Sequence, residues 1–236
     1  MRSYIAMAML LASFSSAAAG DYTEVRNLKL KVGNLEKLVI EAGAGSLDVT
    51  GVDGLNRVEV RATIIVPDVD EDDGKKIVAR DMTLSLDRVG EAAKLKSAFE
   101  RGFWGRGTSS RIDLEVRAPA SLAVAIDDSS GSMDVSDFAA DVWIDDGSGS
   151  IDVRRVGNLR IHDGSGSIDV DGVNGDVHVN DGSGGITIDA VSGSVTIDDG
   201  SGSIRVSDVA KDLIILDDGS GSVSFSDVRG SVEEEG

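Results

Sequence analysis

Aspartates that recur at a nearly constant spacing are the most regular chemical feature of the sequence. Each stands directly before a Gly-Ser-Gly turn or a close variant of it, and the six are Asp128, Asp146, Asp163, Asp181, Asp199 and Asp218. We call them the aspartate column. Carboxylate and turn carbonyl oxygens are the ligands that Ca²⁺ prefers, so a row of weak cation sites is one interpretation. The other is structural: each carboxylate accepts hydrogen bonds from its own turn amides, at a rim where solvent screens its charge.

The spacing favours the structural interpretation. Calcium-binding solenoids repeat the motif Gly-Gly-x-Gly-x-Asp. Here two residues separate Gly149 from Asp152, and residues 154–162 contain no second motif. The sequence therefore predicts no dedicated metal site and no cofactor.

A second candidate site is the segment 101–107, which gathers aromatic and basic residues in a chain with only 4% aromatic residues. Exposed aromatic side chains beside arginine are typical of binding hot spots. Phe103, Trp104 and Arg106 are therefore candidate partner-binding residues. The alternative is that Phe103 and Trp104 close an end of the fold or cover Trp143, which strand alternation places on the outer face.

Other side chains offer little for catalysis. The chain has no cysteine and two histidines, and His162 and His178 occupy positions that other copies fill with Asp or Arg. The serines do not form the Gly-x-Ser-x-Gly motif of hydrolases. Asp145 and Asp146 resemble the acid pairs of polysaccharide-cleaving β-helices, but neighbouring strand residues point to opposite faces. We expect no catalytic residues and no enzyme activity.

Repetition indicates the fold that must position these residues. Successive members of the aspartate column are 18, 17, 18, 18 and 19 residues apart. Within a copy, apolar and polar residues alternate twice, as around Ile151–Val153 and Leu159–Ile161, and no helical spacing is present. The sequence predicts an all-β fold, a β-solenoid of about 18-residue coils with two short strands in each coil.

Alternation assigns a buried face to both strands of a coil. The first strands contribute Met133, Val135, Ile151, Val153, Ile168, Val170, Ile186, Ile188, Ile204, Val206, Val223 and Phe225. A further apolar residue, such as Phe138 or Val156, follows three positions later and fills the turn. In the fifth copy an extra residue leaves two inward pairs open, Leu213 with Ile215 or Ile214 with Leu216.

The two ends of the chain differ in organisation. Residues 1–19 have the charged start, short apolar run and small final residues of a signal peptide. Residues 20–236 are expected to form a single β-solenoid domain. Its regular repeats span 127–232.

The N-terminal part of this domain departs from the repeat. Residues 38–49, followed by 58–60, have the pattern of a degenerate first coil. Residues 61–110 interrupt the pattern and are interpreted as an insertion or cap, since open sheet edges would otherwise pair with other chains. In this interruption the sequence predicts a short helix in 70–80, and a hairpin formed by 83–87 and 94–99.

Charge limits the partners. The chain has 23 Lys and Arg against 42 Asp and Glu, a net charge of −19, which disfavours nucleic acid. No segment is long and apolar enough to span a membrane. Together with the signal peptide, this predicts a periplasmic or secreted protein.

The residues Ile112–Val116, Pro119 and Leu122–Ile126, with the recurring Gly-Ser-[Ile/Val]-x-Val, carry a resemblance to a known family. Over roughly residues 35–232 the sequence resembles the bacterial "putative adhesin" family, whose solenoid is also called a toastrack domain. This resemblance implies a β-solenoid of the cell envelope, with members linked to surface attachment and envelope-stress sensing. It carries over no catalytic residues.

The expected function is that of a non-enzymatic, exported binding or scaffold module of the bacterial envelope. Its partner would be an envelope protein or a glycan. Two alternatives stay open: a polysaccharide-active β-helix enzyme, and an envelope-stress sensor that acts through a membrane partner.

Overall fold

The computed structural model describes residues 20–100 and 110–235. The N-terminal elements are β1 (Tyr22–Lys31), β2 (Lys37–Ala44), β3 (Leu47–Val52), β4 (Arg57–Val66), α1 (Glu71–Asp81), β5 (Met82–Val89), β6 (Ala92–Phe99) and β7 (Arg111–Pro119). The repeats follow as β8 (Ala123–Phe138), β9 (Val142–Asp146), β10 (Gly149–Val156), β11 (Leu159–Asp163), β12 (Gly166–Val173), β13 (Val177–Asp181), β14 (Gly184–Val191), β15 (Val195–Asp199), β16 (Gly202–Val209), β17 (Leu213–Asp217), β18 (Ser222–Val228) and β19 (Val232–Glu234).

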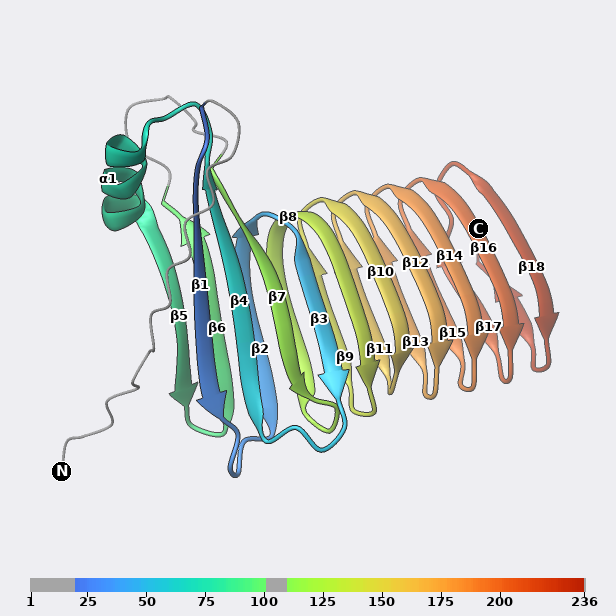
Figure 1. Ribbon diagram of the computed structural model, residues 1–236. Coiled ribbons are helices and arrows are strands. Elements are labelled where there is room, and N and C mark those ends of the chain that lie inside the picture. The colour runs from blue at the N-terminus through green and yellow to red at the C-terminus, as the bar shows by residue number, and fades with distance from the viewer. Residues whose placement is uncertain (1–19, 101–109, 236) are drawn as a thin grey trace.

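The repeats stack as the coils of a parallel β-solenoid, which confirms the predicted fold class (Figure 1). One strand of each coil joins sheet A, in the order β1-β4-β7-β3-β8-β10-β12-β14-β16-β18. The other joins sheet B, in the order β5-β6-β2-β8-β9-β11-β13-β15-β17-β19. The long strand β8 bends at its turn and belongs to both sheets.

Glycine makes the sharp corner between the two strands of a coil. Gly149 and Gly166 lie in register and have positive φ angles of 148° and 152°. A Cβ atom built on Gly166 would overlap the carbonyl oxygen of Gly149 in the preceding coil. The corner thus needs glycine both for its backbone angle and for the close approach of adjacent coils.

The interior is a narrow layer of aliphatic side chains between the two sheets. The residues assigned to the buried face are buried as predicted, except in the last coil. Leu213 and Ile215 are the inward pair of the fifth copy, with exposed fractions of 0% and 1%. The extra residue, Leu216, lies at a shift in register and is exposed.

The turn-filling side chain comes three positions after the last inward residue of the strand, an odd number that would normally point it outward. A residue in the left-handed conformation explains why it points inward. Asp137, Arg155, Gly172, Ala190 and Asp208 have φ angles of 67°, 54°, 77°, 57° and 46°. Each directly precedes the apolar residue that returns to the interior, and all five of these are buried. The positive φ acts as a bulge that resets the alternation.

The N-terminal end departs from one prediction. Residues 58–60 do not complete a coil with 38–49. They belong to β4, which runs antiparallel between β1 and β7, because the turn after β3 reverses the chain direction within sheet A. The coil formed by β2 and β3 lies between β6–β7 on one side and β8 on the other.

The predicted helix and hairpin are both present. Asp70 caps α1 by accepting a hydrogen bond of 2.9 Å from the amide of Asp73. The helix lies beside β1, β4 and β5, at the end of the solenoid away from β18 (Figure 1). Strands β5 and β6 pair as an antiparallel hairpin and extend sheet B beyond β2.

The last coil differs from the others because no described coil covers it. Val223 and Phe225 continue the inward columns of Ile204 and Val206 in register. Phe225 is nevertheless 46% exposed, so the prediction that it is buried is wrong. In the described residues, no helix is long and apolar enough to cross a membrane.

Candidate functional site

The aspartate column lies inside the solenoid. Each of the first five aspartates is two residues beyond an inward aliphatic side chain of sheet B, as Asp163 is beyond Ile161, and so has the same parity. The exposed fractions of Asp128, Asp146, Asp163, Asp181 and Asp199 are 4%, 3%, 1%, 3% and 0%. Asp218, in the last coil, is partly exposed. The prediction of a solvent-screened rim is therefore wrong for five of the six.

The turn amides satisfy only part of the column. One carboxylate oxygen of Asp163, Asp181 and Asp199 accepts a hydrogen bond from the amide two residues on, at 3.2, 3.1 and 3.1 Å. The other oxygen of each has no hydrogen-bond partner in the described residues. Neither oxygen of Asp128 or Asp146 meets hydrogen-bond geometry, although nearby turn amides still favour the charged form of both carboxyls. The turn-forming role is present, but it leaves buried oxygens that lack donors.

Burial changes the protonation of these groups. It raises the pKa of Asp128 to about 7, and the neighbouring Asp146 carboxylate acts in the same direction. Burial also raises the pKa of Asp181 to about 6 and raises those of Asp146, Asp163 and Asp199. Removal from water disfavours the charged form of a carboxyl, and adjacent strands hold the next carboxyl only about 4.8 Å away.

A cation site in the column has little geometric support. Calcium takes six to eight oxygen ligands around one point, whereas the column spaces its carboxylates along a line. Among residues 20–100 and 110–235, no group of three or more His, Cys, Asp or Glu side chains is arranged to hold a metal ion. What the column does offer is a row of carboxyl groups that bind protons.

The outer face of sheet B carries a different group of residues. Trp143, Arg160 and His178 are adjacent in register on β9, β11 and β13, and all three point outward. Trp143 is 40% exposed. The three line a groove of about 550 Å³ that also reaches Asp141, Asn158 and Asp176 at the start of these strands. The groove combines one aromatic surface with several polar side chains.

Hydrogen bonds hold the polar edge of this groove in place. The Asn158 side-chain amide donates to the Asp141 carboxylate at 2.8 Å. The Asn158 carbonyl oxygen accepts from the Asp176 amide at 2.9 Å, and the Asp176 carboxylate accepts from the Ser194 amide at 2.9 Å. Because each turn is tied to the next, the groove is formed before any ligand binds.

The histidines occupy outward positions, as the repeat predicts. His162 forms a hydrogen bond of 2.8 Å through Nδ1 to the side-chain oxygen of Asn180. The Asn180 amide group donates to the Asp198 carboxylate at 2.9 Å. His162 thus belongs to a ladder of side chains across three coils, while His178 faces the groove.

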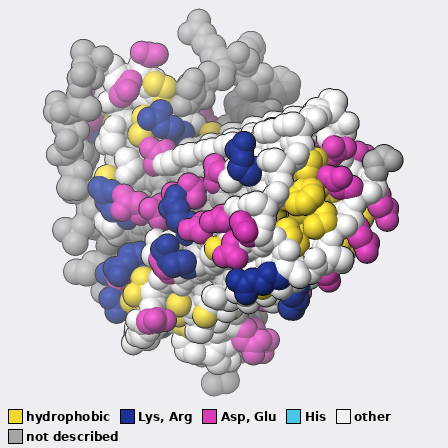
Figure 2. All heavy atoms as spheres, turned by 90° about the vertical axis from the view of Figure 1, so that its right-hand side faces the viewer, with side chains coloured by type: hydrophobic (Ala, Val, Ile, Leu, Met, Phe, Trp, Pro, Cys, Tyr) yellow, Lys and Arg dark blue, Asp and Glu magenta, His cyan; other side chains and the backbone are white. Residues whose placement is uncertain are grey.

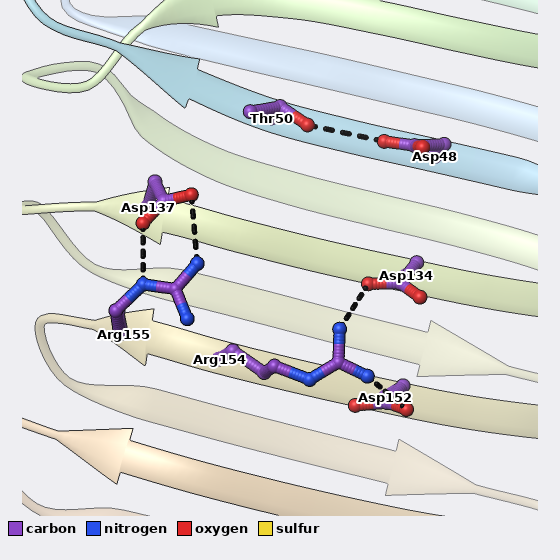
Figure 3. Close-up of polar contacts among 7 residues, drawn as sticks. All are labelled: Asp48, Thr50, Asp134, Asp137, Asp152, Arg154 and Arg155. Atoms are coloured by element: carbon purple, nitrogen blue, oxygen red, sulfur yellow. Dashed lines mark hydrogen bonds and ion pairs between the residues drawn. The ribbon is translucent and has the colours of Figure 1, made fainter.

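Arginines balance acids on the outer face of sheet A (Figure 3). The Arg154 guanidinium contacts Asp134 at 3.1 Å and Asp152 at 2.5 Å. Arg155 makes a two-pronged pair with Asp137, at 2.6 and 2.9 Å. These exposed pairs contribute modestly to stability. They relieve repulsion between the stacked acids of this face.

The structure separates the adjacent acids that resembled a catalytic pair. Asp145 faces outward in register with His162, while Asp146 faces the interior. Phe103, Trp104 and Arg106 lie outside the described residues, as do residues 1–19.

Sequence reasoning missed the groove, although its elements were visible. Alternation placed Trp143 outside, and the 17- and 18-residue steps connect it to Arg160 and His178. Aligning the copies would have put the three side chains in one outward column. Which turn residues meet them depends on the three-dimensional course of the turns.

Because stacked side chains fill the interior, this β-solenoid offers a partner only its outer faces and its ends. No protein family matches the sequence, and neither does any curated protein.

Several solved structures are similar at low sequence identity. A "putative adhesin" from Bacteroides fragilis is 12% identical, with 89% of this chain and 97% of that chain covered and a TM-score of 0.41. A "putative lipid binding protein" from Parabacteroides distasonis is 12% identical, with 90% and 97% covered and a TM-score of 0.41. A "putative cell adhesion protein" from Clostridium sporogenes is 11% identical, with 90% and 99% covered and a TM-score of 0.35.

Proposed function

We propose that this protein is a non-enzymatic, adhesin-like binding module of the bacterial envelope that holds a glycan in the groove on sheet B. The observation that carries the proposal is the exposed indole of Trp143, followed in the same outward column by Arg160 and His178 on a rigid sheet. Export is supported by the signal-peptide pattern of residues 1–19. The groove faces solvent and needs no rearrangement of the fold to be reached.

The chemistry of a sugar suits this groove. A pyranose ring has an apolar face of C–H groups that packs on an aromatic ring, and a rim of hydroxyl groups that both donate and accept hydrogen bonds. Trp143 provides the flat apolar surface. Arg160 provides donors, and Asp141 and Asp176 provide acceptors.

Charge favours a neutral glycan over a polyanionic one. The groove itself mixes Lys37, Arg160 and His178 with Asp141 and Asp176. The whole chain has a net charge of −19, which repels a long anionic polymer at low salt. We therefore expect neutral saccharides to bind more tightly than sulfated or phosphorylated ones.

The arrangement of the acidic residues supports glycan binding rather than glycan cleavage. Glycosidases hold two carboxyl groups on either side of the scissile bond, whereas Asp145 and Asp146 point to opposite sides of sheet B. His178 forms no hydrogen bond to a carboxylate in the part of the chain that the structure describes. The groove residues bind and orient, and we assign none of them to acid or base catalysis.

Calorimetric titration of the purified protein with neutral bacterial surface oligosaccharides tests the proposal. Trp143→Ala should weaken binding at least about tenfold, because a central aromatic side chain commonly contributes 1.4 kcal/mol or more. The matched control is Val89→Ala, which truncates an exposed apolar side chain (57%) that does not line the groove. Equal affinity in both variants would contradict the proposal, and release of reducing ends would favour the enzyme.

A further inference from the structure

The C-terminal end of the solenoid has open edges in both sheets. Within the described residues, β18 pairs only with β16, and β19 pairs only with β17. Their outer edges therefore present backbone N–H and C=O groups that no described strand satisfies. Such an edge is a template for an added strand.

Apolar side chains gather on the same end. Figure 2 shows hydrophobic side chains clustered on the face that closes the solenoid at its C-terminal end. Phe225, Leu216 and Val232 are 46%, 43% and 38% exposed, three of the five large hydrophobic side chains that are exposed in the described part of the chain. Phe225 and Val232 continue the interior columns of Val206 and Leu213. At Phe225 and Val232 the exposed patch is thus the cross-section of the core.

Acidic side chains border the apolar end on the right-hand side of Figure 2. Between residues 212 and 235 the chain has seven acidic residues and one basic residue, Arg229. Arg229 lies 3.6 Å from Asp208, which already partly balances it. None of the seven acids forms an ion pair within the described residues; they are Asp212, Asp217, Asp218, Asp227, Glu233, Glu234 and Glu235.

We infer that this end binds an extended, positively charged segment of another polypeptide, which adds a strand to β18. Backbone hydrogen bonds along the free edge would fix the segment. Its inward apolar side chains would cover Phe225 and Val223. Lys or Arg side chains at the end of the added strand next to the corner would reach the acids at 217–218 and 233–235, which lie at that end of the last coil. We call this surface the C-terminal edge site.

The acids argue against a second copy of this chain as the occupant. Two C-terminal ends facing each other would bring like charges together, which is unfavourable at an interface. Glu234 lies in register with Ile215, in an inward column. A copy packed end to end would bury this charge opposite another Glu234, whereas a cationic segment would neutralise it.

The experiment uses a fluorescein-labelled peptide of alternating Lys and Val residues as the probe, with the purified protein and fluorescence anisotropy as the readout. Saturable binding is expected, weakening at least about tenfold between 50 and 500 mM salt because the charges are screened. Protection of β18 amides from hydrogen exchange on peptide binding would locate it. A peptide of alternating Glu and Val should not bind.

Two variants and two controls test the site. Phe225→Ser removes the apolar contact, and Glu233→Lys with Glu234→Lys reverses the charge, so that each should weaken binding at least about tenfold. Val89→Ser and Trp143→Ala, exposed elsewhere, should leave binding unchanged. Binding that both site variants leave unaltered, protection elsewhere than β18, or no binding would overturn the inference. A dimer in sedimentation that Phe225→Ser dissociates would assign the end to a second copy instead. The glycan proposal is unaffected by either result.

Discussion

Buried aspartates control how the stability of this protein depends on pH. A carboxyl whose pKa is raised in the folded state binds more protons there than in the unfolded chain at intermediate pH. Its favourable contribution to the free energy of unfolding is complete below the pKa of the unfolded chain, about 4. This contribution is lost as the pH rises through the pKa of the folded state. For Asp128 and Asp181 these folded values are about 7 and about 6.

The free energy of unfolding should therefore fall as the pH rises from about 4 to about 7. Asp181→Asn removes one titrating group and gives the unpartnered oxygens of neighbouring coils an amide donor. We expect this variant to be about 1–2 kcal/mol more stable than the parent at pH 8 and similar to it at pH 4. Thermal melts at both values measure the difference.

The control for this prediction is Asp145→Asn, because Asp145 faces outward beside Asp146, a member of the aspartate column. It removes the same formal charge and so accounts for the general repulsion in a chain of net charge −19. If the two variants change the pH profile equally, the buried column has no special role in it.

At the scale of the strand and its turn, the corner glycines limit what the repeat tolerates. Gly166→Ala would place a methyl group on the carbonyl oxygen of Gly149 at a φ of 152°. We expect a loss of more than about 4 kcal/mol, or failure to fold. Gly54 has a φ of 71° but open space around it, so Gly54→Ala should cost about 1–2 kcal/mol. Urea denaturation compares the two, and similar losses would show that crowding between coils is unimportant.

At the left-handed residue before each turn-filling side chain, a change to glycine is expected to stabilise the protein, whereas the loss of a corner glycine destabilises it. Ala190 has a φ of 57°, which costs an L-residue about 1–2 kcal/mol. Ala190→Gly should therefore stabilise the protein by about 0.5–1 kcal/mol after the entropy of the unfolded chain is subtracted. Ala44→Gly, at an exposed position of β2 without a positive φ, should destabilise by about 0.5–1 kcal/mol. Chemical denaturation measures the free energy of unfolding of both variants. A change of the same sign in both would contradict this account.

Much of this element-level design could be predicted from spacing alone. Alternation identified both strands of each coil, and the period identified their stacking. It could not reveal that Asp163 faces inward, because a polar residue beside a turn is normally read as solvated. The choice between Leu213 with Ile215 and Ile214 with Leu216 as the inward pair depended on where the extra residue bulges. The reversed direction of β4 depended on the turn after β3, whose sequence resembles the other turns. The groove required the register of three coils, which a single copy does not contain.

At the scale of the whole molecule, the fold behaves as a one-dimensional stack. Each coil contacts only its neighbours, so an inner coil is supported on two sides and the last coil on one. The N-terminal end carries α1 and the antiparallel strands β1, β4 and β5. The C-terminal coil has no such cover among the described residues, and Phe225 is exposed there. Stability should decrease toward that end.

One substitution made in two coils tests this gradient. Val173 and Val228 belong to the same turn-filling column, connected in register through Val191 and Val209. Val173 is 1% exposed, while Val228 is only partly buried. Because two buried methyl groups and a cavity are involved, Val173→Ala should cost about 2–3 kcal/mol, and Val228→Ala less than about 1 kcal/mol. Urea denaturation gives both values. Equal losses would mean that the last coil is as tightly packed as the centre, and that β18 is not the open edge which the cationic segment requires.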